Sequence, residues 1–399
     1  MKLAILGTRG VPPSYGGFET FAAELSTRLA QRGHEVSVYC REAPSSGLRP
    51  PSPLCGGEKA TSASSLSSLL PSARGEGGRR PDEGSTWNGV HRIVLPAIGH
   101  KYLETVSHGF LSALDALRRD FDAVLVCNAA NAFVLPLLRA ARIPAIINVD
   151  GIERRRRKWN IFGRIVYSIG EAFSVSFANL VIADAGVIAS YYREQYGLSP
   201  ITIPYGADFP EEDDSDVLER LGIRRDDYIL YVSRFEPENN PLEVVEAYEK
   251  LDAAPSLVML GKGLYARELV DELHRHASER VIFPGALYGR DYRTLQRNAR
   301  LYIQATEVGG THPALIEAMA AGGRVVAHDT PENREVGGDA VGYFDLRPEE
   351  TLSAAIREWL ANPLMAQDFQ VRARRRAAER YSWGHVTDEY ERLFQSLRP

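Results

Sequence analysis

Residues 1–39, MKLAILGTRGVPPSYGGFETFAAELSTRLAQRGHEVSVY, contain the pattern that decides the fold. A short apolar run at residues 3–6 predicts a buried strand, and residues 18–32 carry their apolar side chains at helical spacing. Gly33 predicts the end of that helix, and residues 36–39 predict a second strand. A glycine-rich loop and a helix between two buried strands indicate a parallel α/β sheet.

The same alternation continues along the chain. Further strands are expected at 90–95, 123–127, 145–149, 180–183 and 201–204, and after a break at 228–232, 257–260, 281–283, 301–303 and 324–327. Helices are expected at 103–119, at 242–251 and over a long last segment, 363–397. These two series predict an α/β protein of two Rossmann-like, doubly wound domains that face each other across a cleft. We place the first domain at 1–208, the second at 209–375, and a helix that packs back on the first domain at 376–399.

Composition agrees with two globular domains. The chain has 399 residues, of which 44% are hydrophobic and 25% charged, enough for two cores of ordinary polarity. The net charge of −5 argues against general nucleic-acid binding. Three widely spaced cysteines predict free thiols in a reducing compartment. The opening residues are interpreted as a strand and not as a signal peptide, and no apolar run reaches membrane-spanning length, so we expect a cytoplasmic protein.

Two stretches interrupt the α/β pattern. In residues 44–86, Ser, Gly and Pro fill 23 of 43 positions without any apolar period, which predicts a flexible insertion. The acidic cluster at 211–216 predicts an exposed linker between the domains.

The loop after the first strand is the first candidate site. Gly16 and Gly17 stand directly before a helix, where the backbone can approach a ligand and the free N–H groups of the first turn can bind a phosphate. A turn with no ligand is the alternative. A dinucleotide fingerprint fits worse, because Gly7, Gly10 and Gly16 are too widely spaced for it.

Two further motifs belong to the second domain. Arg234 follows the strand at 228–232, where an arginine can hold a diphosphate through two hydrogen bonds, although a solvated arginine fits equally well. The segment EVGGTHPALIEAMAAG, residues 307–322, is the most specific signal. Its Gly309, Gly310 and Thr311 lead into a helix that begins near Pro313, and Glu317 lies one turn further, where a carboxylate can bind ribose hydroxyls.

The segment NVDGIERRRRKW, residues 148–159, follows a predicted strand. Asp150 is expected at the cleft, or else it fixes the turn through its own backbone. The basic and aromatic residues after it suit an anionic, lipid-linked acceptor at a membrane face, and a solvated helix face explains them equally well; they are Arg154, Arg155, Arg156, Arg157, Lys158 and Trp159. No histidine or carboxylate spacing favours a metal site, so we expect no metal and no other cofactor.

These motifs resemble the retaining GT-B glycosyltransferases of family 4. Within that family, VSRFEPENN, EVGGTHPALIEAM, NVDGIERRRRKW and LGTRGVPPSYGGFE are similar to the bacterial rhamnosyltransferase branch. The resemblance covers nearly the whole chain except 44–86. It implies that the first domain receives the acceptor and that the second binds a nucleotide sugar, and the net charge argues against a nucleic-acid partner. The implied reaction is transfer of a sugar, L-rhamnose from a TDP donor, to a lipid-linked or saccharide acceptor in surface-polysaccharide synthesis.

The resemblance also implies residue roles, with two departures. Gly309 stands where the family usually has a first glutamate, and Asn239 stands where it usually has a lysine. Lys262 is therefore our candidate for the missing cation. We assign donor binding to Gly16, Gly17, Arg234, Lys262, Gly309, Gly310, Thr311 and Glu317. We assign catalysis to Asp150, Arg234 and Lys262.

Two other functions share this pattern. A sugar-nucleotide epimerase of the same fold would need no saccharide acceptor, and a binding protein would use the cleft only as a nucleotide-sugar sensor. The products formed from a nucleotide sugar distinguish the three.

Overall fold

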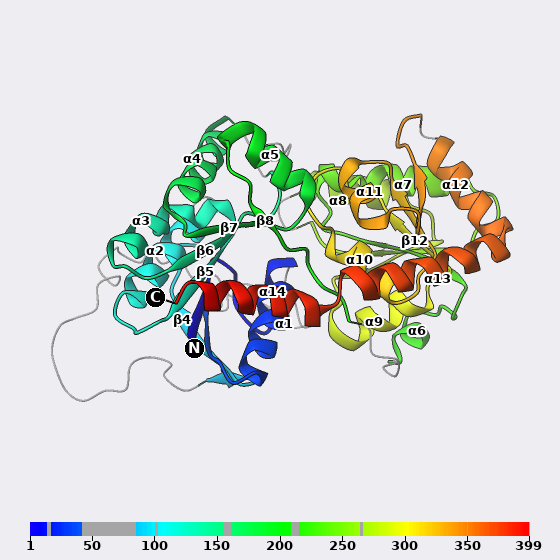
Figure 1. Cartoon of the computed structure of the whole chain (residues 1–399). Helices are drawn as coiled ribbons and strands as arrows, with labels where there is room; N and C mark the ends of the chain where they lie inside the picture. Colours follow the sequence, from blue (N-terminus) through cyan, green and yellow to red (C-terminus); the bar gives the residue numbers. More distant parts are fainter. Residues whose placement is uncertain are drawn as a thin grey trace, which may run out of the picture.

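The computed structural model describes residues 1–13, 17–41, 85–99, 103–152, 154, 161–208, 215–263, 266–348 and 350–398. Two parallel sheets, each covered by helices on both faces, form an N-terminal and a C-terminal half that lie side by side (Figure 1). This confirms the predicted α/β architecture of two Rossmann-like units.

The N-terminal sheet has the strand order β3-β4-β2-β1-β5-β6-β7-β8. Its strands are β1 (Lys2–Leu6), β2 (Glu35–Arg41), β3 (Thr86–Trp87), β4 (Val90–Leu95), β5 (Ala123–Cys127), β6 (Ala145–Asn148), β7 (Leu180–Ala183) and β8 (Ile201–Thr202). All pairings are parallel except β3 with β4. Every residue of β5 is buried, as expected for a strand covered on both faces.

The C-terminal sheet repeats this plan with the order β11-β10-β9-β12-β13-β14, entirely parallel. Its strands are β9 (Tyr228–Val232), β10 (Ser256–Leu260), β11 (Val281–Gly285), β12 (Leu301–Gln304), β13 (Val325–His328) and β14 (Gly342–Phe344). In both halves the first strand is central and the chain order reverses beside it. Such a reversal opens a crevice at the carboxyl ends of the strands.

Helices cover the two faces of each sheet. The N-terminal half has α1 (Gly17–Gln31), α2 (Glu104–Ala116), the short 3-10 helix η2 (Ala129–Val134), α3 (Leu135–Ala140), α4 (Ile161–Phe177) and α5 (Gly186–Tyr196). The C-terminal half has α6 (Val217–Arg220), η4 (Pro237–Asn239), α7 (Pro241–Glu249), α8 (Arg267–His276), α9 (Gly289–Asn298), α10 (Pro313–Ala320), α11 (Pro331–Gly337), α12 (Glu350–Ala361) and α13 (Pro363–Arg380). The last helix, α14 (Trp383–Ser396), packs against α1.

The prediction that the flexible insertion at 44–86 extends to residue 86 is wrong. Thr86 belongs to β3, which forms an antiparallel hairpin with β4. Asn88 and Gly89 turn this hairpin with positive φ angles of 47° and 82°. An Asn-Gly pair is the strongest short-range hairpin signal, because these residues tolerate the left-handed conformation that a two-residue turn requires. The rest of the insertion that precedes Ser85 lies outside the described residues, as does most of the acidic linker.

The single long helix expected at 363–397 is also wrong, because the structure divides it into α13 and α14. Tyr381 leaves the helical conformation, and the Ser382 hydroxyl accepts a hydrogen bond from the His385 backbone N–H at 3.2 Å. Serine is a preferred N-cap for this reason. The break sends α14 onto the N-terminal half, so that the C-terminus lies in the same half as the N-terminus (Figure 1).

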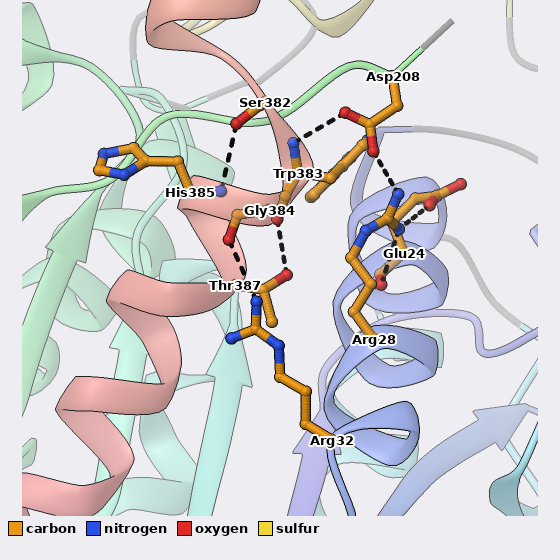
Figure 2. A network of polar contacts seen from close by, with 9 residues as sticks. All are labelled: Glu24, Arg28, Arg32, Asp208, Ser382, Trp383, Gly384, His385 and Thr387. Carbon is orange, nitrogen blue, oxygen red and sulfur yellow. Dashed lines mark hydrogen bonds and ion pairs between the residues drawn. The ribbon is translucent and has the colours of Figure 1, made fainter. Parts of the chain in front are cut away.

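The chain therefore crosses between the halves at two places, and the two crossings touch. The backbone N–H of Ala207, in the first crossing, donates to the Tyr381 carbonyl at 2.6 Å. Figure 2 shows how Asp208 extends this contact, since its carboxylate accepts from the Trp383 N–H at 3.2 Å and pairs with Arg28 of α1 at 2.6 Å. A Cβ on Gly206 would lie 2.6 Å from the Trp383 ring, so only glycine allows this close approach.

The hydrophobic core is also continuous between the two halves. One face of the N-terminal sheet and the neighbouring face of the C-terminal sheet share a continuous cluster of buried side chains. At its centre Phe21 of α1 packs against Tyr205 and Tyr390, with ring centroids 5.2 Å and 5.3 Å apart. The opposite face of each sheet has a core of its own. Burial thus fixes α14 against the N-terminal half.

Candidate functional site

A cavity of about 1010 Å³ lies between the two halves. Its walls come from the loops that follow β1, β5 and β6 on one side and β9, β10 and β12 on the other. These loops leave the carboxyl ends of the strands where each sheet reverses its order, the usual position for a ligand in such sheets. The volume is at the upper end for small-molecule sites.

Two helices begin at this cavity from opposite sides. Gly17 starts α1 and Pro313 starts α10, and a Cβ on Gly17 would lie 3.2 Å from the Pro313 Cγ. The N-terminus of a helix presents unpaired N–H groups and a partial positive charge. Two such ends beside one cavity make an environment that favours an anion.

Most of the site residues predicted from the sequence line this cavity. They are Gly17, Asp150, Arg234, Lys262, Gly309, Gly310, Thr311 and Glu317. Gly16 and the basic and aromatic residues Arg155, Arg156, Arg157, Lys158 and Trp159 lie outside the described residues. Among the predicted residues that the structure describes, Arg154 is the exception.

Arg154 lies away from the cavity, against α4 and α5. Its guanidinium stacks 5.0 Å over the Tyr191 ring and approaches the Glu171 carboxylate to 3.7 Å. Glu171 is 2% exposed and also accepts hydrogen bonds from Tyr191 and Tyr196, each at 2.7 Å. A buried carboxylate needs such partners. The structure thus gives Arg154 a stabilising contact inside the N-terminal half.

Arg234 and Lys262 lie on adjoining loops. The Phe235 N–H donates to the Lys262 carbonyl at 3.1 Å, and a Cβ on Gly261 would come within 1.8 Å of the Ser233 carbonyl oxygen. The loops after β9 and β10 are therefore pressed together, which brings both cations to the same wall of the cavity. Arg234 Nη1 lies 3.6 Å from Glu236 Oε1, a long contact at a side chain that is 36% exposed.

Asn239, the residue that departs from the family pattern, has a visible role. Its side-chain amide donates to the Arg234 carbonyl at 2.6 Å, and the residue is buried. It thus fixes the backbone that carries Arg234 and does not itself supply a charge.

Glu317 lies one turn inside α10, with its carboxylate accepting a hydrogen bond from the Tyr292 hydroxyl of α9. Burial raises the pKa of Glu317 to about 7, and the nearby Glu24 adds to this, while the Tyr292 hydrogen bond opposes it. Gln296 in turn donates to the Tyr292 hydroxyl at 2.9 Å. A carboxylate with this pKa changes its charge near neutral pH.

Sequence reasoning missed Asp184, which follows β7 directly. The Thr311 backbone N–H, one of the amides expected to bind a ligand, donates to Asp184 Oδ2 at 2.6 Å. The Thr311 hydroxyl also donates to the Asp184 carbonyl. Asp150 was selected because it directly follows a predicted strand. Asp184 also directly follows a predicted strand, so the same signal could have identified it.

The described residues contain no helix that is long and apolar enough to cross a membrane. Within the same part of the chain, no three His, Cys, Asp or Glu side chains gather as a metal site requires. Cys40 and Cys127 are buried free thiols.

Comparisons with known proteins find glycosyltransferases. The family model "Glycosyl transferases group 1" matches residues 216–376, and the model "Glycosyltransferase Family 4" matches residues 15–209. A phosphatidyl-myo-inositol mannosyltransferase of Mycolicibacterium smegmatis is 25% identical over 96% of this chain and 90% of its own length.

Two solved structures share the whole architecture. Sucrose-phosphate synthase from Thermosynechococcus elongatus has a TM-score of 0.78 at 17% identity, covering 99% of this chain and 98% of its own. Anabaena HepE in complex with UDP-glucose has a TM-score of 0.73 at 14% identity, covering 99% of both chains. At these identities the likeness concerns the fold.

Proposed function

Because the chain belongs to the GT-B glycosyltransferases and such enzymes transfer hexosyl groups, we propose that its donor is a nucleotide sugar held in the cavity between the halves. The finer assignment is L-rhamnose from a TDP donor, moved with retention of configuration to a lipid-linked or saccharide acceptor in surface-polysaccharide synthesis. The similarity of residues 232–240 and 307–319 to the rhamnosyltransferase branch supports that assignment.

One observation carries the proposal. Arg234, Lys262 and the beginnings of α1 and α10 all meet at one cavity, which therefore attracts the diphosphate of a sugar nucleotide. Glu317, one turn inside α10, also lines the cavity, where its carboxylate would accept hydrogen bonds from ribose hydroxyls.

In the proposed reaction, the bond between the anomeric carbon and the diphosphate oxygen breaks while a bond to the acceptor oxygen forms. The acceptor proton passes to the departing diphosphate on the same face of the sugar. Arg234 and Lys262 stabilise the charge that grows on the diphosphate, as positioned donors do in a water-poor site. We expect these groups to replace a metal ion.

A panel of nucleotide sugars tests the donor assignment. A ligand of the cavity at about 100 times its dissociation constant adds about 2.7 kcal/mol to the free energy of unfolding, so thermal shift should rank TDP- and UDP-sugars. Arg234→Ala should reduce both donor affinity and turnover, and Glu317→Ala should weaken donor binding by about 1.5–3 kcal/mol. The exposed Arg224→Ala is the matched control and should behave as the parent. Equal donor binding by all three variants and the parent would exclude this cavity.

We further propose that the N-terminal half attaches to an anionic membrane face, where a lipid-linked acceptor is found. On α4, Ile161, Ile165 and Ile169 are 77%, 53% and 50% exposed and stand four residues apart, on one side of the helix. On α2, Phe110 is 45% exposed. Both helices lie on η2, because Gly109 of α2 and Gly170 of α4 approach its residues closely. In the sequence the basic run directly precedes α4, and an apolar surface together with basic residues suits interfacial binding.

Vesicle sedimentation tests this attachment. The double variant Ile165→Ser and Ile169→Ser should bind vesicles of phosphatidylglycerol and phosphatidylcholine less well than the parent while binding the nucleotide sugar unchanged. Leu364→Ser is the control, because Leu364 is 82% exposed but lies in the C-terminal half. Equal sedimentation of the double variant and the parent would contradict the attachment.

A further inference from the structure

The segment after β7 joins the two halves through reciprocal hydrogen bonds. Asp184, from the N-terminal half, accepts from the Thr311 N–H at 2.6 Å. Glu335 of α11, from the C-terminal half, accepts from the N–H groups of Gly186 and Val187 at 2.6 Å and 3.0 Å. Glu335 thereby caps the beginning of α5 with a negative charge, a favourable position for it. Each half supplies one carboxylate to the backbone of the other.

Asp184 is the more unusual of the two carboxylates because it is completely buried. The Gly309–Thr311 loop is packed directly on it, and a Cβ on Gly310 would lie 2.1 Å from Asp184 Oδ1. Only a glycine fits at position 310. The loop that begins α10 is therefore held by contact with an N-terminal residue as well as by its own half.

The other neighbour of Asp184 is Asp150. Burial raises the pKa of Asp184 well above its usual value, and the charge of Asp150 and a hydrogen bond with its side chain raise it further, while the Thr311 N–H opposes this. Two carboxyl groups form a hydrogen bond only when one of them is protonated. Burial, followed by the charge of Asp150, therefore favours the protonated form of Asp184.

The titratable groups around the pair come from three other elements. Tyr205 follows β8, Tyr390 belongs to α14, and Cys127 ends β5. All three are buried with a raised pKa and remain neutral at ordinary pH.

We propose that Asp184 is a positioning residue that holds both walls of the cavity, Thr311 on the C-terminal side and Asp150 on the N-terminal side. This inference rests on the proposed function, since it assigns Asp184 to the donor site of a glycosyltransferase. Asp184 does not line the cavity and so acts through these two neighbours.

Two substitutions of Asp184 differ in the hydrogen bonds that they keep. Asparagine has the shape of protonated aspartic acid, so Asp184→Asn can accept from the Thr311 N–H with its oxygen and donate from its amide group to Asp150. Asp184→Ala removes both bonds and leaves the Thr311 N–H without its partner. If Asp184 acted only through its negative charge, both substitutions would reduce kcat/KM equally.

The experiment compares the variants Asp184→Ala and Asp184→Asn with the exposed control Asp227→Asn. Calorimetry measures the donor affinity of each variant. Kinetic assays measure kcat, KM and the pH profile of kcat/KM. Asp184→Ala should raise the donor KM and lower kcat, with a total loss in kcat/KM of about tenfold to a hundredfold, the size of a lost charge-assisted hydrogen bond. Asp184→Asn should stay within about threefold of the parent, a difference below one such bond. Because asparagine does not titrate, it should also lose any alkaline decline in kcat/KM that comes from deprotonation of Asp184, whose pKa is raised by burial and by the charge of Asp150.

Parent-like kinetics of Asp184→Ala would overturn the inference, and so would an Asp184→Asn variant as impaired as the alanine variant. If Asp184→Ala does not fold, Asp184→Val replaces it, because valine fills more of the buried space but offers no acceptor to the Thr311 N–H. The same loss as for the alanine variant is then expected, and no loss would overturn the inference. A parent that binds no nucleotide sugar would refute the proposed function instead.

Discussion

At the residue scale, Glu317 is the group whose charge should control donor binding near neutral pH. Ribose hydroxyls donate hydrogen bonds, and an ionised carboxylate accepts two of them, whereas the protonated acid accepts less well. Because burial raises the pKa of Glu317 to about 7, the ionised fraction falls as pH drops through that value. Donor affinity should fall in the same direction.

Calorimetric titration with a nucleotide sugar between about pH 8 and about pH 5.5 measures this effect as a proton linkage. The affinity of the parent should begin to fall near pH 7 and decrease by about tenfold to thirtyfold across the range, the limit for one proton with this pKa. A nucleotide sugar is preferable to a free nucleoside diphosphate, since its diphosphate is esterified at both ends and does not titrate in this range. Glu317→Gln stays neutral and should show weak, flat affinity. The same slope in both proteins would assign the titration to another group.

Single residues also show where sequence reasoning reaches its limit. Asp150, Arg234 and Glu317 were found because each follows a predicted strand or begins a predicted helix, and the structure brings all three to one cavity. Asp184 and Glu335 were missed because their partners are 127 and 149 residues away, and such contacts depend on how two separately folded halves meet. Gly17 was predicted to approach a ligand or to form a turn without one, and neither interpretation anticipated that a Cβ there would meet Pro313 of the other half.

At the scale of elements, strands were predictable and the breaks between helices were not. Fully covered parallel strands are continuous apolar runs, which few other structures produce. The break at Tyr381 and Ser382 has only a weak signal, a serine two residues before a glycine inside an otherwise helical pattern. The burial of α14 against α1 determines where the helix breaks. Because α1 and α14 are distant in the sequence, no local pattern predicts this contact.

The cap of α14 can be tested by Ser382→Ala. The variant loses the acceptor for the His385 N–H, so the free energy of unfolding should fall by about 0.5–2 kcal/mol. Urea denaturation measures the change. Ser396→Ala, at the last residue of the same helix, makes no cap and should change the free energy by less than about 0.5 kcal/mol. An unchanged midpoint for Ser382→Ala would mean that the serine cap does not help to hold α14.

The arginines of α13 show a second principle at this scale. Arg374 donates to the Ala321 carbonyl at the end of α10, and Arg376 donates to the Val336 and Glu335 carbonyls near the end of α11. Helix ends leave such carbonyls unpaired, and cations are favoured there. The basic character of α13 is thus explained by the two helices it supports.

At the scale of the whole molecule, Gly206 decides how closely the two chain crossings pack. Gly206→Ala places a methyl group within 2.6–2.9 Å of Trp383, including its backbone, so one crossing must move. We expect a loss of about 1–3 kcal/mol in stability, as for other overpacked sites. Differential scanning calorimetry of Gly206→Ala measures it, with Gly99→Ala as the control, because a Cβ on Gly99 meets no atom within 4 Å. A melting temperature equal to that of the control would contradict the expectation.

The pairing of the two crossings has a mechanical consequence. Bodies that are joined at two neighbouring points can swing about the line through those points, but they cannot slide past one another. The hydrogen bond between Ala207 and Tyr381 marks that hinge axis. Tyr205, Ala207, Asp208 and Trp383 stand beside the axis and also line the cavity. Rotation about this axis, once the Asp184 and Glu335 hydrogen bonds between the halves are broken, would widen the cavity least at this edge and most at the opposite one.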